Sequence, residues 1–317
     1  MALNPVNAAS PPRNAGPSWG YAFLRRADRW LPAPLFNFFL GIGTWVAVAR
    51  MPAERANSGR YLRALWGRAA TRREVWKHFH AFARVFILRL RVAEGRPHRC
   101  RPTPGCEGFM ALMKSGRPAL LGTFHLGNSD LLEFFLRGFR LELCMIRLRV
   151  GNSADVDHLA ERFAPWVNFI WVNETENLLF ALKQAAQSGG SIALKCDRPE
   201  HSAKLEAFDF LGERRMFPVT IYHLALMFKR PVVFCVSVPG AEDESLIYAS
   251  PVFEPEDDTK AANLERAHAH FQEFLVRVEA LLRLHPFLWF NFTPLNPTAS
   301  PSTPASPVPP RSALLPC

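Results

Sequence analysis

An apolar run, a glycine-containing turn and a helical pattern follow one another directly in the first half of the chain. The run 118–124 has strand character, and residues 130–139 have the pattern of a helix. Gly122 and Gly127 loosen the backbone around the turn, and Asn128 or Ser129 can cap the helix. His125 is therefore expected at the end of a strand, with a helix starting immediately after the turn.

Asp130 follows in the first turn of that expected helix, where the helix dipole favours a carboxylate. From there it is expected to reach back to the imidazole of His125. With an unperturbed pKa near ~6.5, a histidine held by a carboxylate can accept a hydroxyl proton at neutral pH. Spacing alone leaves the alternative open that His125 is an ordinary strand-end histidine and Asp130 only a capping residue.

From residue 116 onward, strand-like runs alternate with helical patterns in the manner of an α/β domain. With 317 residues and 49% hydrophobic composition, the chain can bury a substantial core. We expect an α/β fold with a single mixed-sheet domain, flanking helices and an N-terminal apolar helix. The expected strands are 118–124, 141–148, 167–172, 191–196, 231–238 and 246–253, and the expected helices are 130–139, 156–163, 175–187, 219–228 and 261–284.

Several kinds of chemistry lack support in the sequence. The six cysteines lack metal-ligand spacing and several lie in apolar runs, which is typical of reduced core residues. His78 and His80, two residues apart on a helix, point in different directions and do not form a metal site. The chain has no glycine-rich phosphate loop and no Gly-x-Ser-x-Gly nucleophile motif, so a covalent serine mechanism is not expected.

Two further candidate sites follow the expected strand 191–196. Asp197 and Arg198 come at its end, the same edge of the sheet as His125, where open α/β sheets bind their ligands. Arg198 is a candidate clamp for a phosphate or a carbonyl oxygen, and the alternative is an Asp–Arg pair that holds a loop. Further on, Phe210 and Gly212 lie in an aromatic loop that either lines an acyl groove or packs in the core.

Positive charge is concentrated near the N-terminus. Residues 13–101 contain 18 Lys or Arg and four Asp or Glu, whereas the whole chain has a net charge of +10. Residues 30–49 contain no charged residue and have arginines on both sides, which favours an anionic membrane surface over nucleic acid. The stretch is just long enough to cross a bilayer, although Pro32 and Pro34 weaken a spanning helix.

We therefore expect a membrane anchor that either spans the bilayer or inserts partly, with a buried core helix as the alternative. More arginines follow the stretch than precede it, which predicts that the rest of the chain is cytoplasmic. The expected organisation is a disordered leader over 1–18, a membrane-associating and amphipathic helical region over 19–101, an α/β domain over 102–296, and a disordered Pro/Ser-rich tail over 297–317.

Four motifs resemble, in order and spacing, those of the bacterial lipid A biosynthesis acyltransferases within the lysophospholipid acyltransferase superfamily. They are His125-Leu-Gly-Asn-Ser-Asp130, Asp197-Arg198, Phe210-Leu-Gly212 with Phe217-Pro218, and Trp289-Phe-Asn-Phe292. The chain is also similar to the predicted acyltransferases of aryl polyene and flexirubin-type pigment clusters, which have segments like Arg60-Tyr61-Leu62 and His78-Phe79-His80. The resemblance extends over residues 19–296.

The resemblance implies that His125 and Asp130 form a catalytic dyad. Members of the family transfer a fatty acyl chain from an acyl-carrier protein or coenzyme A thioester to a hydroxyl of a membrane lipid or glycolipid. The thioester is a co-substrate, and no other cofactor or metal is implied. A departure lies after Pro218, where relatives usually have Thr-Gly-Pro and this chain has Val219-Thr220-Ile221, which affects the expected acceptor contacts.

The expected mechanism is direct transfer, in which His125 removes the acceptor proton as the hydroxyl attacks the thioester carbon. Backbone N–H groups around Gly127, or the guanidinium of Arg198, are the candidate donors to the oxyanion. Arg147 and Arg149, after the second expected strand, are candidates for binding a phosphate of donor or acceptor. An acyl thioesterase and a non-catalytic protein that binds lipid or acyl carrier are the alternatives.

Overall fold

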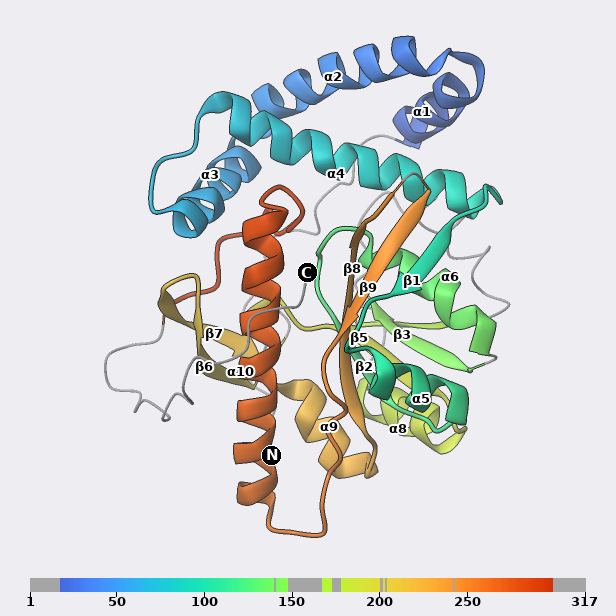
Figure 1. Cartoon of the computed structure of the whole chain (residues 1–317), viewed down its shortest axis with the longest axis vertical. Helices are drawn as coiled ribbons and strands as arrows, with labels where there is room; N and C mark the ends of the chain where they lie inside the picture. Colours follow the sequence, from blue (N-terminus) through green and yellow to red (C-terminus); the bar gives the residue numbers. More distant parts are fainter. Residues whose placement is uncertain are drawn as a thin grey trace.

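The computed structural model describes residues 18–139, 141–147, 167–172, 178–199, 202, 204–241 and 243–298 (Figure 1). Nearly all of the expected leader and tail, the expected helix over 156–163 and the candidate residue Arg149 lie outside these described residues.

The centre of the molecule is a mixed seven-stranded sheet, and the expected α/β class with a mixed sheet is confirmed. Strand order is β1-β9-β8-β2-β5-β3-β4, with β8 and β9 antiparallel and the other neighbours parallel. The strands are β1 (Arg99–Pro102), β2 (Leu120–Thr123), β3 (Leu143–Arg147), β4 (Val167–Trp171), β5 (Ser191–Lys195), β8 (Val232–Pro239) and β9 (Glu244–Ala249). Six of them match expected strands. The seventh, β1, was not expected, and it crosses the expected domain boundary after residue 101.

Both faces of the sheet are buried under helices, as parallel strands require. Neighbouring side chains in a strand point to opposite faces, so Leu120 packs in one apolar cluster and Leu121 in the other. The cluster that contains Leu120 includes side chains from α8 (Leu178–Gln187), α9 (Thr220–Phe228) and α10 (Lys260–Leu284), and it continues into the N-terminal helices described below. Two helices have side chains in the other cluster: α5 (Glu107–Ser115) and α6 (Leu132–Leu136).

An antiparallel hairpin, formed by β6 (Leu205–Phe210) and β7 (Glu213–Pro218), packs beside α10 (Figure 1). Its two turn residues, Leu211 and Gly212, both have positive φ angles, of 53° and 79°. Two such residues between antiparallel strands match the twist of a hairpin. The aromatic segment around Phe210 is therefore a hairpin turn and not an open loop.

The segment after the turn departs from the single helix expected over 130–139. It consists of a 3₁₀ turn η1 (Ser129–Leu131), the short helix α6 and a second 3₁₀ turn η2 (Arg137–Phe139). The hydroxyl of Ser129 donates to the carbonyl of Leu126, and the amide of Leu131 donates to the carbonyl of Asn128. These short-range bonds tighten the first turn and place Asp130 in a 3₁₀ geometry.

Four N-terminal helices form a separate layer across one end of the molecule (Figure 1). They are α1 (Ser18–Trp30), α2 (Ala33–Arg50), α3 (Pro52–Trp66) and α4 (Arg72–Ala93). The apolar stretch over 30–49 is not one helix, because α1 ends at Trp30 and Pro32 precedes α2. In α4, Thr71 and Glu74 form a reciprocal capping box that fixes the first turn.

One face of α2 is packed and the other is open. Phe36, Leu40, Thr44 and Val48 recur every four residues and are buried, and the packing partner is α4. The opposite face exposes large apolar side chains, including Phe38 at 62%. By length and composition α2 is a candidate membrane span, the only one found among the described residues.

Helices α3 and α4 are attached to the segment that follows α10. The side-chain amide of Asn57 donates to the carbonyl of Phe292 at 2.8 Å, and the hydroxyl of Tyr61 donates to the carbonyl of Pro286 at 2.9 Å. His78 is fully buried, with Nε2 2.8 Å from the carbonyl oxygen of Trp289, and burial lowers its pKa to about 4. The helical layer therefore holds the segment 289–292 in place.

Candidate active site

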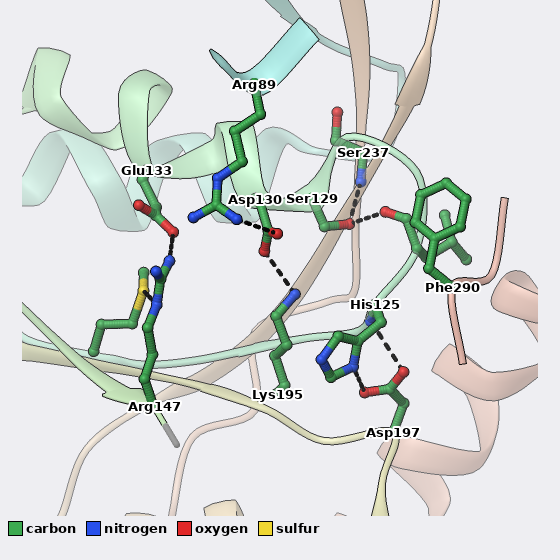
Figure 2. Close-up of polar contacts among 12 residues, drawn as sticks. Arg89, His125, Ser129, Asp130, Glu133, Arg147, Lys195, Asp197, Ser237 and Phe290 are labelled. Carbon is green, nitrogen blue, oxygen red and sulfur yellow. Dashed lines mark hydrogen bonds and ion pairs between the residues drawn. The ribbon is translucent and has the colours of Figure 1, made fainter. Parts of the chain in front are cut away.

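The imidazole of His125 is held by the carboxylate of Asp197 (Figure 2). In the parallel pair β2 and β5, Thr123 lies opposite Lys195 at the strand ends, and His125 and Asp197 each follow two residues later. His125 Nδ1 lies 2.8 Å from Asp197 Oδ1, and the backbone amide of His125 donates to Oδ2 at 3.0 Å. The pair thus lies at the carboxyl ends of parallel strands, where α/β proteins bind ligands.

Trp289 supplies a third hydrogen bond to this carboxylate. Its indole Nε1–H donates to Asp197 Oδ2 at 2.9 Å, and both side chains are fully buried. Burial raises the pKa of Asp197, but His125, through its charge when protonated and its hydrogen bond, and nearby Arg198 and Lys195 outweigh it and hold this pKa below its usual range. Asp197 is therefore ionised and only accepts hydrogen bonds.

The ionised carboxylate fixes the protonation of the imidazole. Because Asp197 can only accept, Nδ1 of His125 carries the proton and Nε2 carries the lone pair. Burial lowers the pKa of His125 to about 4; Asp197 opposes this shift, and the charges of Arg198 and Lys195 add to it. The side chain remains 25% exposed, and among the described residues none bonds to Nε2, so a ligand can reach the lone pair of the neutral imidazole.

The expected contact between Asp130 and His125 is not formed. One oxygen of Asp130 lies 2.7 Å from the ammonium of Lys195, and the other accepts from the guanidinium of Arg89 at 3.0 Å (Figure 2). The 3₁₀ turn η1 directs Asp130 toward α4 and the end of β5, and the carboxylate at His125 comes from Asp197. Burial raises the pKa of Asp130, but Lys195, Arg89 and Arg147 outweigh it and hold this pKa well below the ordinary value.

A second carboxylate–guanidinium pair lies beside this cluster. Arg147, at the end of β3, is bonded to Glu133 of α6, and its guanidinium also lies over the ring of Phe169 at 4.9 Å from the ring centre. The candidate phosphate-binding residue Arg147 is therefore engaged within the protein, and its side chain is mostly buried. Because Glu133 is almost fully buried, its negative charge needs the guanidinium of Arg147 as a partner.

The backbone amides around Gly127 are already used, contrary to the expectation that they bind an oxyanion. The amide of Gly127 donates to the carbonyl of Leu288 at 2.7 Å, and that of Asn128 donates to the carbonyl of Ser237 at 2.7 Å. Gly127 has a φ of +50°, and a Cβ there would lie 2.4 Å from the same Ser237 oxygen. The side-chain amide of Asn128 donates to Ser245 at 2.7 Å, so Asn128 ties the turn to β9.

The remaining sequence candidates divide between the site and the core. The guanidinium of Arg198 donates to the carbonyl of Phe290 at 3.2 Å, which ties the loop after β5 to the segment after α10. Phe210 is fully buried, with its ring edge-on to that of Trp289. Gly212 lies in the hairpin turn. Of the two alternatives for this aromatic segment, the structure shows core packing.

Sequence reasoning missed two cations, Lys195 and Arg89. A signal for Lys195 was available, since it lies two residues before Asp197 near the end of the expected strand 191–196. No such signal existed for Arg89, because α4 precedes the sheet and only the packed structure brings it to Asp130.

The site holds its charges by ion pairs between side chains. Among the described residues, no group of three His, Cys, Asp or Glu side chains is arranged to bind a metal ion.

Comparison with models of known protein families gives no match, and no curated protein matches the sequence significantly. The functional argument therefore depends on the motifs and on the geometry of the site.

Proposed function

We propose that the protein is an acyltransferase that moves a fatty acyl chain from an acyl thioester to a hydroxyl group of a lipid or glycolipid. The observation that supports this most is the arrangement of His125, whose Nδ1 is bonded to the buried Asp197 while Nε2 is left as a proton acceptor. A neutral imidazole oriented by a carboxylate is the arrangement that general-base catalysis requires. The resemblance of the four motifs to the lipid A biosynthesis acyltransferases gives the reaction class.

In the proposed reaction the acceptor oxygen attacks the carbonyl carbon of the thioester, and Nε2 of His125 takes the hydroxyl proton. The carbonyl electron pair moves to its oxygen, which becomes an oxyanion. When this intermediate collapses, the carbon–sulfur bond breaks and the imidazolium returns its proton to the thiolate. Asp197 stabilises the transient imidazolium, and the products are an ester and a thiol.

Membrane association is part of the proposal, and the open face of α2 is its basis. This face exposes Phe38, Phe39, Trp45 and Val46, each about half exposed or more, with arginines in α1 before it and Arg50 after it. Apolar side chains flanked by cations match the interface of a leaflet with anionic lipids. Because the opposite face of α2 is packed on α4, we propose that the helix lies in the surface of the inner membrane and does not span it.

The proposed location places the active site on the cytoplasmic side, where acyl-carrier protein and coenzyme A thioesters are available. An acyl thioesterase is the second candidate function, because the same imidazole would activate water equally well. The two reactions differ in the acceptor alone, so an assay that identifies the product separates them.

The test uses membranes from cells that express the full chain, with labelled acyl-carrier protein and acyl-coenzyme A as donors and mass spectrometry of the lipids. We expect a new acylated lipid with the wild type and none with His125→Asn. His223→Asn, a substitution of a half-buried histidine on α9, is the matched control and should retain the product. Free fatty acid as the only product would support the thioesterase, and equal products from wild type and His125→Asn would refute catalysis by this residue.

A further inference from the structure

The ammonium group of Lys195 is held beside His125 by a carboxylate. Lys195 is the last residue of β5 and lies opposite Thr123 of β2, and His125 and Asp197 each follow two residues after this pair. Asp130 Oδ1 lies 2.7 Å from Nζ. In Figure 2 the ammonium points toward Asp130, and the imidazole of His125 lies on the other side of the lysine side chain, close enough for the charge of Lys195 to help lower the pKa of His125.

This ammonium retains hydrogen-bonding capacity. A lysine has three N–H donors, and Asp130 is the one protein acceptor within hydrogen-bond distance among the described residues. The side chain is 28% exposed, so a ligand can reach it. Of the oxyanion donors expected from the sequence, the Gly127 amide donates to Leu288, and the guanidinium of Arg198 is tied by one of its N–H groups to the carbonyl of Phe290.

The charge balance of the cluster suits a single negative charge. Asp130 is shared by Lys195 and Arg89, so one carboxylate offsets one of two cations and a charge of +1 remains. An oxyanion that forms on a thioester carbonyl carries one negative charge. A phosphate dianion would exceed what this cluster can neutralise.

We propose that the ammonium group of Lys195 binds the oxyanion of the tetrahedral intermediate, and that Asp130 positions it. The inference rests on the proposed acyl transfer, in which the acceptor oxygen bonds to the thioester carbon and the carbonyl pair moves onto oxygen. Lys195 donates an N–H to that oxygen while His125 holds the acceptor proton. Asp130 therefore acts through Lys195, and the carboxylate that acts through His125 is Asp197.

The test compares Lys195→Met with Lys114→Met, a control lysine exposed on α5. A donor that acts on an oxyanion stabilises the transition state more than the bound substrate. We therefore expect kcat of Lys195→Met to fall about 10²–10³-fold with KM changed less than threefold. Lys195→Arg should retain part of the activity, and Lys114→Met all of it.

A second measurement detects the oxyanion contact itself. With a dithioester donor, in which sulfur replaces the carbonyl oxygen, the developing charge rests on a poorer hydrogen-bond acceptor. We expect the ratio of rates for the oxygen and sulfur donors to fall at least tenfold in Lys195→Met. If Lys195→Met does not fold, Asp130→Asn takes its place, because the ammonium is then present but untethered and the same ratio should fall.

The outcomes separate this inference from the proposed function. No transfer by the wild type with any donor would refute the function. Transfer by the wild type that is lost in His125→Asn, together with wild-type kcat and rate ratio in Lys195→Met, would refute the role of Lys195 alone. A raised KM with unchanged kcat would also refute it, because Lys195 would then bind the substrate in its ground state.

Discussion

Replacing Asp197 by asparagine changes one oxygen of a buried carboxylate into an NH₂ group. The carboxylate accepts three hydrogen bonds: Oδ1 from Nδ1 of His125, and Oδ2 from the amide of His125 and the indole of Trp289. Asparagine has one acceptor oxygen, so it can satisfy only one of these two groups of donors.

Its preferred orientation follows from counting the donors. If the NH₂ group took the place of Oδ2, two buried donors would face a third donor. Each unpaired group would destabilise the folded state by about 1–3 kcal/mol. If it took the place of Oδ1, it would face only Nδ1 of His125, which can become an acceptor by moving its proton to Nε2. The second orientation costs less, and it removes the lone pair that accepts the proton from the substrate.

We therefore expect Asp197→Asn to fold with a small loss of stability and to lose about 10³–10⁴-fold in kcat/KM, as expected when the catalytic histidine is held in the wrong tautomer. Acyl-transfer kinetics measure the loss, and urea unfolding measures the stability. Nitrogen-15 NMR of labelled histidines should show the proton of His125 on Nε2, with the signal assigned by its absence in His125→Asn.

The matched control is Asp257→Asn, which changes an exposed carboxylate before α10 and should transfer acyl chains at the wild-type rate. The reasoning would be refuted if Asp197→Asn stayed within threefold of the wild type while Asp130→Asn was inactive. That result would make Asp130 the partner of His125, as the sequence predicts.

Three further predictions concern pH, packing and the membrane. Burial holds the pKa of His125 at about 4, so kcat/KM should stay level down to about pH 5, whereas an acid limb near 6.5 would contradict a depressed pKa. As the pH drops, His125 binds a proton in the unfolded chain before it does so in the folded protein, because its pKa is lower in the folded state. The free energy of unfolding should therefore fall as the pH drops from about 6.5 toward 4. Gly122→Ala would place a Cβ 2.3 Å from a phenylalanine ring and should cost about 1–3 kcal/mol in urea unfolding, whereas Gly59→Ala on α3 has open space and should not destabilise. Phe38→Glu on α2 should weaken the binding of the protein to anionic vesicles about tenfold in a flotation assay. Val276→Glu, at an equally exposed position on α10, should leave this binding unchanged. Equal binding by the two variants would exclude α2 as the membrane contact.

Local patterns were sufficient to predict most of the sheet and the long helices. The run over 231–238 became β8 within one residue at each end, because a continuous apolar stretch bounded by breakers is suited to a strand buried on both faces. The hairpin around Leu211 was not predicted, since its turn requires a leucine with positive φ, which the sequence does not signal.

The sequence predicted which residues belong to the candidate site better than it predicted which of them contact one another. His125 and Asp197 were both placed at the carboxyl edge of the sheet, and both lie there. The expectation that Asp130 bonds to the imidazole was wrong, because it assumed a regular helix directly after the turn. The parallel register of β2 and β5, which joins residues 72 positions apart, decided which carboxylate reaches the histidine.

The sequence by itself determined the α/β class, the strand that delivers His125, and the apolar stretch between arginines, because each depends on side-chain order within about 20 residues. Only the tertiary structure decided the pairing of charges: Asp197 with His125, and Asp130 with Lys195 and Arg89. Ion pairs and hydrogen bonds act over a few ångströms. Which groups come that close depends on strand order and helix packing, which local patterns do not contain.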